Sequence, residues 1–221
     1  MSQIIITGAT GMVGKGVLLA CLKDPFIKKI TLISRKSVGI EDPKISEILL
    51  EDFSNLLSIE QHIDTIDACF HCMGVSSIGM SESEYTLKTL HYTQLLSDLC
   101  YQLNPNSTFC YVSGTGTDET EQGRQMWARV KGKTENYSRY KGFYQVLLFR
   151  PGMILPEDQI QSSTAWYNTI YKLLKPFYPL FKRMKNVTTT SRIGNAMINA
   201  LKSPQNQVVY LKNKAINASA K

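Results

Sequence analysis

The stretch Ile4-Ile5-Ile6-Thr7-Gly8-Ala9-Thr10-Gly11-Met12-Val13-Gly14 decides the fold of this 221-residue chain. Its β-branched run is typical of a buried strand, and the glycines that follow are typical of a turn into a helix. Gly8 would turn the chain off the strand, Gly11 would let backbone approach a pyrophosphate, and Gly14 would let the helix pack closely. A flexible N-terminal turn is the alternative. We predict a dinucleotide phosphate site lined by Gly8, Thr10, Gly11, Met12, Val13 and Gly14.

Composition limits the classes of protein that this chain can belong to. The net charge of +7 suits an anionic ligand, but there is no Lys/Arg tract or nucleic-acid motif, so we expect no nucleic-acid partner. No apolar stretch reaches the roughly 20 residues of a membrane span. An N-terminal strand leaves no room for a signal peptide, and five scattered cysteines favour a reducing compartment. We therefore predict a cytoplasmic protein.

The segment Cys69-Phe70-His71-Cys72 looks like a metal or redox motif. It follows Ile66-Asp67-Ala68, which predicts that it ends a buried strand. Alternate side chains of a strand point to opposite faces and cannot converge on one metal ion. We therefore favour strand core here and expect no metal site.

Apolar runs of strand length alternate with segments of helical periodicity along the whole chain. This rhythm predicts an α/β fold, a doubly wound parallel sheet with helices on both faces and ligands at the carboxyl ends of the strands. We expect strands at 3–7, 29–34, 47–50, 66–72, 108–113, 144–149 and 207–211. We expect helices at 12–23, 81–103, 124–139, 164–174, 176–184 and 191–202. In the second helix, capped by Ser81, we expect Leu87, Leu90, Leu95 and Leu99 to face inward.

The end of the second expected strand indicates which coenzyme would bind. Folds that bind NAD place an acidic residue there, to bond the ribose hydroxyls. Here Ser34 takes that position and Arg35 and Lys36 follow. An arginine can bind a 2′-phosphate through two N–H groups, so we predict NADP(H) over NAD(H), with Arg35 as main contact and Ser34 as second donor. A solvated loop is the alternative.

Two further strand ends complete the expected coenzyme site. Asp52 and Phe53 close the third strand and would border the adenine. Gly74, after the fourth strand, would let the chain pass close to the adenine ribose.

Several motifs spread along the chain share one pattern: Gly8/Gly11/Gly14, Asp52, Gly74, Ser113, Lys131 and Arg150-Pro151-Gly152. On these motifs, nearly the whole chain resembles the short-chain dehydrogenase/reductase superfamily, in its atypical branch related to extended epimerases and dehydratases. The resemblance implies that Ser113 orients a substrate carbonyl and that Lys131 holds the nicotinamide ribose. The family's catalytic tyrosine precedes the lysine by four positions, and here that position is Trp127.

An indole N–H donates a hydrogen bond but has no accessible proton equilibrium of the phenol type. We therefore interpret Trp127 as an apolar lid or donor beside the nicotinamide. Tyr137 and Tyr140 lie more than two turns further along and are expected to point elsewhere. His71 has a suitable pKa range for a substitute proton donor, but a lone strand histidine is more often structural.

The last third of the chain is expected to build the substrate side. We treat 1–221 as one domain in which 152–190 forms a small helical cap over the nicotinamide end, with an apolar pocket. A packed helical pair with solvated lysines is the alternative. Aromatic and basic residues within 172–185 could also anchor the chain to a membrane surface, which we consider the least favoured interpretation.

Two functions lead the interpretation. The first is an NADP(H)-dependent oxidoreductase acting on a small, largely apolar carbonyl or related substrate. Its catalytic residues would be Ser113, Lys131 and Trp127, the last in the position of the usual tyrosine. The second is a non-catalytic NADP(H)-binding sensor or scaffold, which the loss of the tyrosine favours. A homodimer is a further expectation, because segments 81–103 and 124–139 are the faces that this fold commonly pairs.

Overall fold

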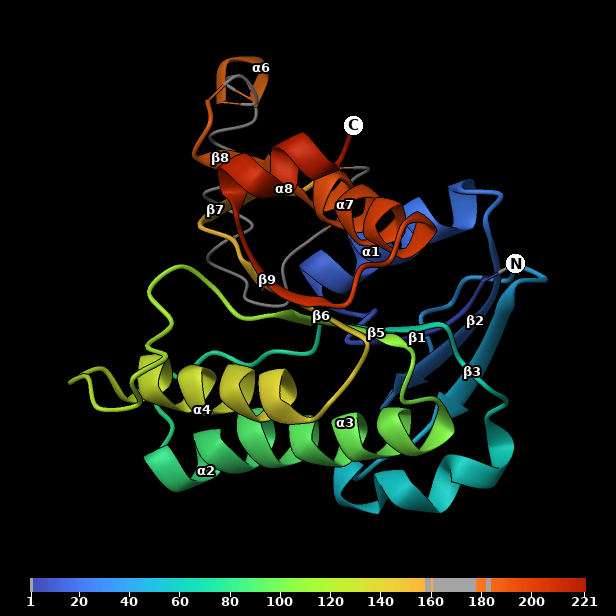
Figure 1. Ribbon diagram of the computed structural model, residues 1–221, viewed down its shortest axis with the longest axis horizontal. Helices are drawn as coiled ribbons and strands as arrows, with labels where there is room; N and C mark the ends of the chain where they lie inside the picture. The colour runs from blue at the N-terminus through green and yellow to red at the C-terminus, as the bar shows by residue number, and fades with distance from the viewer. Residues whose placement is uncertain (1, 158–159, 161–177, 182–183) are drawn as a thin grey trace.

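A computed structural model describes residues 2–157, 160, 178–181 and 184–221. Its central element is a seven-stranded sheet of order β3-β2-β1-β4-β5-β6-β9, in which all neighbouring strands are parallel (Figure 1). The strands are β1 (Ser2–Thr7), β2 (Ile27–Ser34), β3 (Ile45–Leu49), β4 (Ala68–His71), β5 (Thr108–Val112), β6 (Gln145–Arg150) and β9 (Gln207–Lys212). Strand order reverses beside β1, which is where this kind of sheet binds ligands.

Helices cover both faces of the sheet. One face carries α1 (Met12–Lys23), α7 (Thr190–Lys202) and α8 (Asn213–Ser219), and the other carries the 3₁₀ segment η1 (Phe53–His62), α3 (Tyr92–Leu103) and α4 (Met126–Tyr140) (Figure 1). Strand β1 shows why: Ile4 and Ile6 pack toward α1 and α7, while Ile5 between them packs toward α3. The predicted doubly wound parallel sheet is confirmed.

The helix expected at 81–103 is interrupted. It comprises α2 (Glu82–Thr86), a π-helical turn η2 (Leu87–His91) and α3. Ser81 caps its start by accepting a hydrogen bond from the Glu84 N–H, as its spacing predicted. The π turn rotates the preceding residues relative to α3, so that Leu87 is 45% exposed while Tyr85 and Thr89 are buried. The predicted inward position of Leu87 is therefore wrong.

Four elements were not predicted. They are η1, α8 and the two short strands β7 (Met153–Leu155) and β8 (Val187–Thr189), which form a separate parallel pair. More than half of the cap predicted for 152–190 falls outside the described residues, and so does the whole of the expected helix at 164–174. Of the helix expected at 176–184, residues 178–181 and 184 are described. Within that region the structure describes a four-residue helix, α6 (Tyr178–Phe181).

Candidate functional site

The glycine turn between β1 and α1 has the close packing that the sequence predicted. Gly8 has a φ of +74°, and a Cβ there would lie 2.6 Å from the backbone of Cys72. A Cβ on Gly14 would lie 2.1 Å from the Gly8 carbonyl oxygen. Because both obstacles are backbone atoms, neither position can accept a side chain without moving the turn.

The start of α1 follows the carboxyl end of β1, at the edge of the sheet where ligands are expected. Gly11 is its N-cap residue, has no side-chain capping bond, and no acidic residue follows in the first turn. The first N–H groups of a helix have no partner within it, so those of Met12 and Val13 can bind an anion. Thr10 is exposed beside them. This cradle fits the diphosphate of a dinucleotide.

At the end of β2, the two predicted donors have different surroundings. Ser34 is buried, and its hydroxyl donates to the Lys36 carbonyl oxygen at 2.7 Å, which closes the turn. Arg35 is exposed and has no hydrogen bond or ion pair with any residue that the structure describes. Arg35 is therefore the available guanidinium at this corner, while the Ser34 proton is already used.

The residues predicted to border the adenine, Asp52 and Phe53, lie at the start of η1. Asp52 caps η1 by accepting from the Ser54 N–H at 2.9 Å. Hydrogen bonding from the Ser54 side chain, and then from its N–H, lowers the pKa of the Asp52 carboxyl. Phe53 is buried, with its ring 5.8 Å from that of Tyr92. A Cβ on Gly74 would meet nothing within 4 Å. The chain leaves open space beside Gly74, where a ribose is expected to lie.

Ser113 and Lys131 meet at the carboxyl edge of the sheet. Ser113 follows β5, Lys131 lies on α4, and the Lys131 ammonium donates a short hydrogen bond to the Ser113 carbonyl oxygen. Burial lowers the pKa of Lys131 to about 8, and only the nearby Glu135 carboxylate opposes this shift. Lys131 can therefore exchange a proton close to neutral pH.

Sequence reasoning did not assign a role to Glu135, which is fully buried beneath Ser113. Its carboxylate accepts the Ser113 hydroxyl at 2.5 Å and a bidentate contact from Arg150, with the shortest N–O distance 2.5 Å. The Ser113 proton is thus used inside the protein, and the hydroxyl offers lone pairs rather than a donor. The spacing of Lys131 and Glu135, one helical turn apart, was the available signal.

Trp127 lies on the same helix, one turn before Lys131. Its indole N–H donates to Gln125 Oε1 at 3.1 Å, and its ring packs on Gly116, where a Cβ would lie 3.0 Å from the ring. Gly116 has a φ of +92°, which favours glycine. The ring therefore forms a half-buried apolar wall, and its N–H bonds within its own loop.

The other candidate proton donors point elsewhere. His71 is fully buried between Thr7 and Thr93, and burial lowers its pKa to about 3. Because Thr93 donates its own proton to the Thr89 carbonyl, His71 Nε2 donates to Thr93 and Nδ1 accepts from Thr7. His71 is therefore a neutral structural residue.

Tyr137 and Tyr140 are the two tyrosines that follow on the same helix. The Tyr137 hydroxyl donates to Asp98 on α3 at 2.5 Å, and Tyr140 is 74% exposed. Both point away from the site, as expected.

The segment at 69–72 packs as the end of a buried strand, with alternate side chains on opposite faces of the sheet. Cys69 lies in the core on the α3 face, while Cys72 packs against the α1 face. Among the described residues no group of three or more His, Cys, Asp or Glu could hold a metal ion. No helix among them is long and apolar enough to cross a membrane.

The model of the NAD dependent epimerase/dehydratase family matches residues 4–141, more than half of the chain. The chain belongs to this family. The match begins at β1 and ends just after α4, so it contains the glycine cradle, Ser113, Trp127, Lys131 and Glu135. The resemblance to the short-chain dehydrogenase/reductase superfamily is confirmed, and the chain has an NAD(P)-binding, oxidoreductase-like fold.

Two relatives of this chain are identical to it at about a quarter of the aligned residues. Protein HTATIP2 from Rattus norvegicus is 25% identical over 97% of this chain and 87% of its own. Protein fmp52-1, mitochondrial, from Aspergillus terreus is 23% identical over 70% of this chain and 67% of its own. Because relatives include mitochondrial proteins, the predicted cytoplasmic location stays a prediction.

Solved structures share the fold at low identity. The Bordetella bronchiseptica enzyme WbmH, in complex with NAD+, has a TM-score of 0.69 at 14% identity and covers 96% of this chain and 75% of its own. A short chain dehydrogenase family protein from Francisella tularensis has a TM-score of 0.67 at 14% identity, with 97% and 98% covered.

Proposed function

We propose that this protein is an NADP(H)-binding oxidoreductase that acts on a small, largely apolar carbonyl compound. Its proton donor would differ from the tyrosine usual in the superfamily, because Trp127 takes that position. The observation that carries the proposal is the uncapped start of α1 beside Gly8 and Gly14, at the same sheet edge where Lys131 meets Ser113. A nicotinamide bound there would supply or accept the hydride. The exposed Arg35 supports a preference for the 2′-phosphate of NADP(H).

The proton chemistry would fall to Lys131. In the described part of the chain its ammonium has one acceptor, the Ser113 carbonyl oxygen, which leaves two N–H bonds. With a pKa of about 8, it holds a proton at neutral pH and can release it to a developing alkoxide. Trp127 would exclude water from one side, and Glu135 would fix the Ser113 hydroxyl as an acceptor.

A specific observation also favours the second candidate, a non-catalytic NADP(H) sensor or scaffold. The two groups that should donate toward a carbonyl are engaged: the Trp127 N–H bonds to Gln125 and the Ser113 hydroxyl bonds to Glu135. A sensor would bind coenzyme and present a changed surface to a partner. A second copy of the chain, paired through α3 and α4, is the protein partner that we propose; we propose no nucleic-acid partner.

Turnover and binding must be measured together to separate these functions. We expect wild type to consume NADPH slowly with part of a diverse carbonyl panel, and Trp127→Tyr to raise the rate by about 10²-fold or more, the contribution of a placed general acid. Trp127→Phe is the matched control and should give no increase. Fast wild-type turnover that slows in Trp127→Tyr would contradict our account of the missing acid. Binding without consumption in every variant would favour the sensor.

A further inference from the structure

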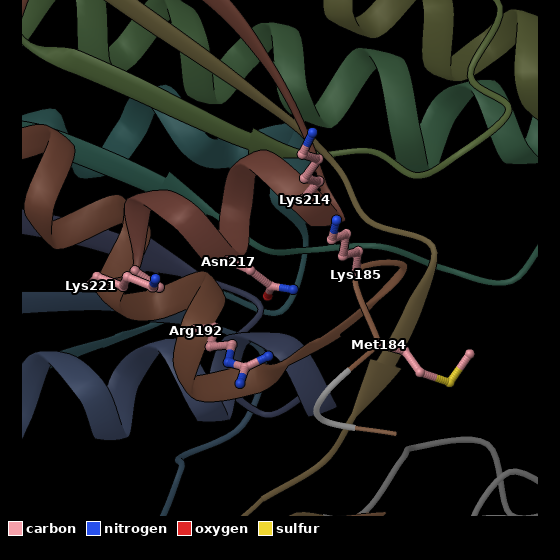
Figure 2. Close-up of a pocket in the computed structure, with 7 residues that line it drawn as sticks. Met184, Lys185, Arg192, Lys214, Asn217 and Lys221 are labelled. Carbon is pink, nitrogen blue, oxygen red and sulfur yellow. The ribbon is translucent and has the colours of Figure 1, made fainter. Parts of the chain in front are cut away.

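A basic cavity of about 300 Å³ lies between the start of α7, α8 and the segment at 184–185 (Figure 2). It is lined by Met184, Lys185, Arg192, Lys214, Asn217, Ala220 and Lys221. Four of these side chains are cationic and none is acidic. The side chains of the lining therefore carry a net positive charge, which attracts anions.

Asn217 adds a specific polar contact to this cavity. Its side-chain nitrogen donates to the Val187 carbonyl oxygen at 2.9 Å, and this bond fixes which way the amide faces. The other end, Oδ1, is buried and has no hydrogen-bond partner among the described residues. Figure 2 shows the amide between Lys185 and Arg192. A buried acceptor without a donor costs about 1–3 kcal/mol, so a ligand that brings a donor would gain from this contact.

The cavity is separate from the proposed coenzyme and catalytic site. Its helices α7 and α8 lie on the sheet face that carries α1, whereas Trp127 and Lys131 lie on α4 at the opposite face (Figure 1). None of its lining residues belongs to the cradle or to the Ser113 network. The cavity is therefore built from residues that the proposed function does not use.

We propose that this cavity binds a phosphate monoester that also carries a hydroxyl group. The phosphate would face the lysine and arginine side chains, and the hydroxyl would donate to Asn217 Oδ1. The volume is at the small end of ligand pockets, so it suits one phosphorylated ring rather than a dinucleotide. A soluble sugar or inositol phosphate and the headgroup of a phosphoinositide lipid share this chemistry.

The test uses the full chain and two probes that share the headgroup. Calorimetry with myo-inositol monophosphate tests the soluble source. Co-sedimentation with phosphatidylcholine vesicles that contain a phosphatidylinositol monophosphate tests the lipid source. Unphosphorylated myo-inositol and pure phosphatidylcholine vesicles are the matched blanks. Binding of either phosphorylated probe supports the proposal, and the arm that binds identifies the source.

Variants show whether the binding occurs in this cavity. Lys214→Ala should weaken it by about fivefold, the effect of losing one exposed ion pair. Lys28→Ala removes another exposed lysine, from β2 and outside the cavity lining, and should leave the binding unchanged. Binding of neither probe would overturn the proposal, as would equal losses in both variants or full affinity in Lys214→Ala. Loss of binding in Arg35→Ala would place the probe at the coenzyme site and also overturn it.

Discussion

At the scale of single residues, backbone crowding at Gly14 supports the diphosphate cradle. We predict that Gly14→Ala destabilises the protein by about 1–3 kcal/mol, the usual cost of overpacking, although alanine is the better helix former. The reason is the 2.1 Å approach of the new Cβ to the Gly8 carbonyl. Chemical denaturation measures this change.

Gly74→Ala is the control for stability, because Gly74, like Gly14, has no positive φ but a Cβ there meets nothing within 4 Å. It measures the effect of an added methyl group without a clash. A Gly14→Ala protein as stable as wild type would mean that the turn can open, which would weaken the case for a rigid cradle.

Lys131 predicts a pH dependence of folding. Its pKa is about 8 in the folded protein and near 10.5 when exposed, so the unfolded chain binds more protons between these values. Stability contributed by this residue therefore rises from about pH 8 toward pH 10 and is lowest below pH 8, where the buried ammonium is charged. Lys131→Met should lack this rise and be the more stable protein at pH 7. Parallel denaturation profiles for the two proteins between pH 7 and pH 10 would contradict the assignment.

At the scale of elements, the π turn in the helix at 82–103 changes which leucines matter. Leu87 is 45% exposed, whereas Leu99 is fully buried. We predict that Leu99→Ala costs about 2–5 kcal/mol of unfolding free energy and that Leu87→Ala costs less than about 1 kcal/mol. Denaturant titration of both variants checks this, and similar losses would mean that the helix is regular in solution.

The same helix shows where sequence reasoning ends. Ser81 and Glu84 predicted its start because a cap is a local interaction, but the periodicity gave no sign of the extra residue in the π turn. Strands β7 and β8 were missed because each has three residues, too few to show alternation. The seven longer strands were predicted to within two residues because each carries a local apolar run.

The candidate site divides in the same way. Gly8, Gly11 and Gly14 follow one another along the chain, so their arrangement could be predicted from spacing. The contact of Glu135 with Arg150 joins α4 to β6 across the sheet edge, and no local pattern fixes such a pair. The role of the Ser34 hydroxyl in closing its own turn was likewise hidden, because it depends on the path of the backbone.

At the scale of the whole molecule, the parallel sheet brings separate segments to one edge. The carboxyl ends of the strands bring together the turn after β1 and the residues that follow β2 and β5 (Figure 1). Lys131 of α4 joins them through its hydrogen bond to Ser113. Helices pack on both faces of the sheet and hold this edge in place, α1 and α7 on one face and α3 on the other. The proposed function therefore depends on the binding of NADP(H) at this edge.

Calorimetric titration of the full chain with NADPH and NADH, for wild type and Arg35→Ala, tests that claim most directly. We predict saturable binding of NADPH that is tighter than binding of NADH, and loss of about tenfold or more of the NADPH affinity in Arg35→Ala with little change for NADH. Equal or tighter binding of NADH by wild type would contradict the assigned preference. Absence of heat and of thermal protection with every nicotinamide coenzyme would contradict the account as a whole.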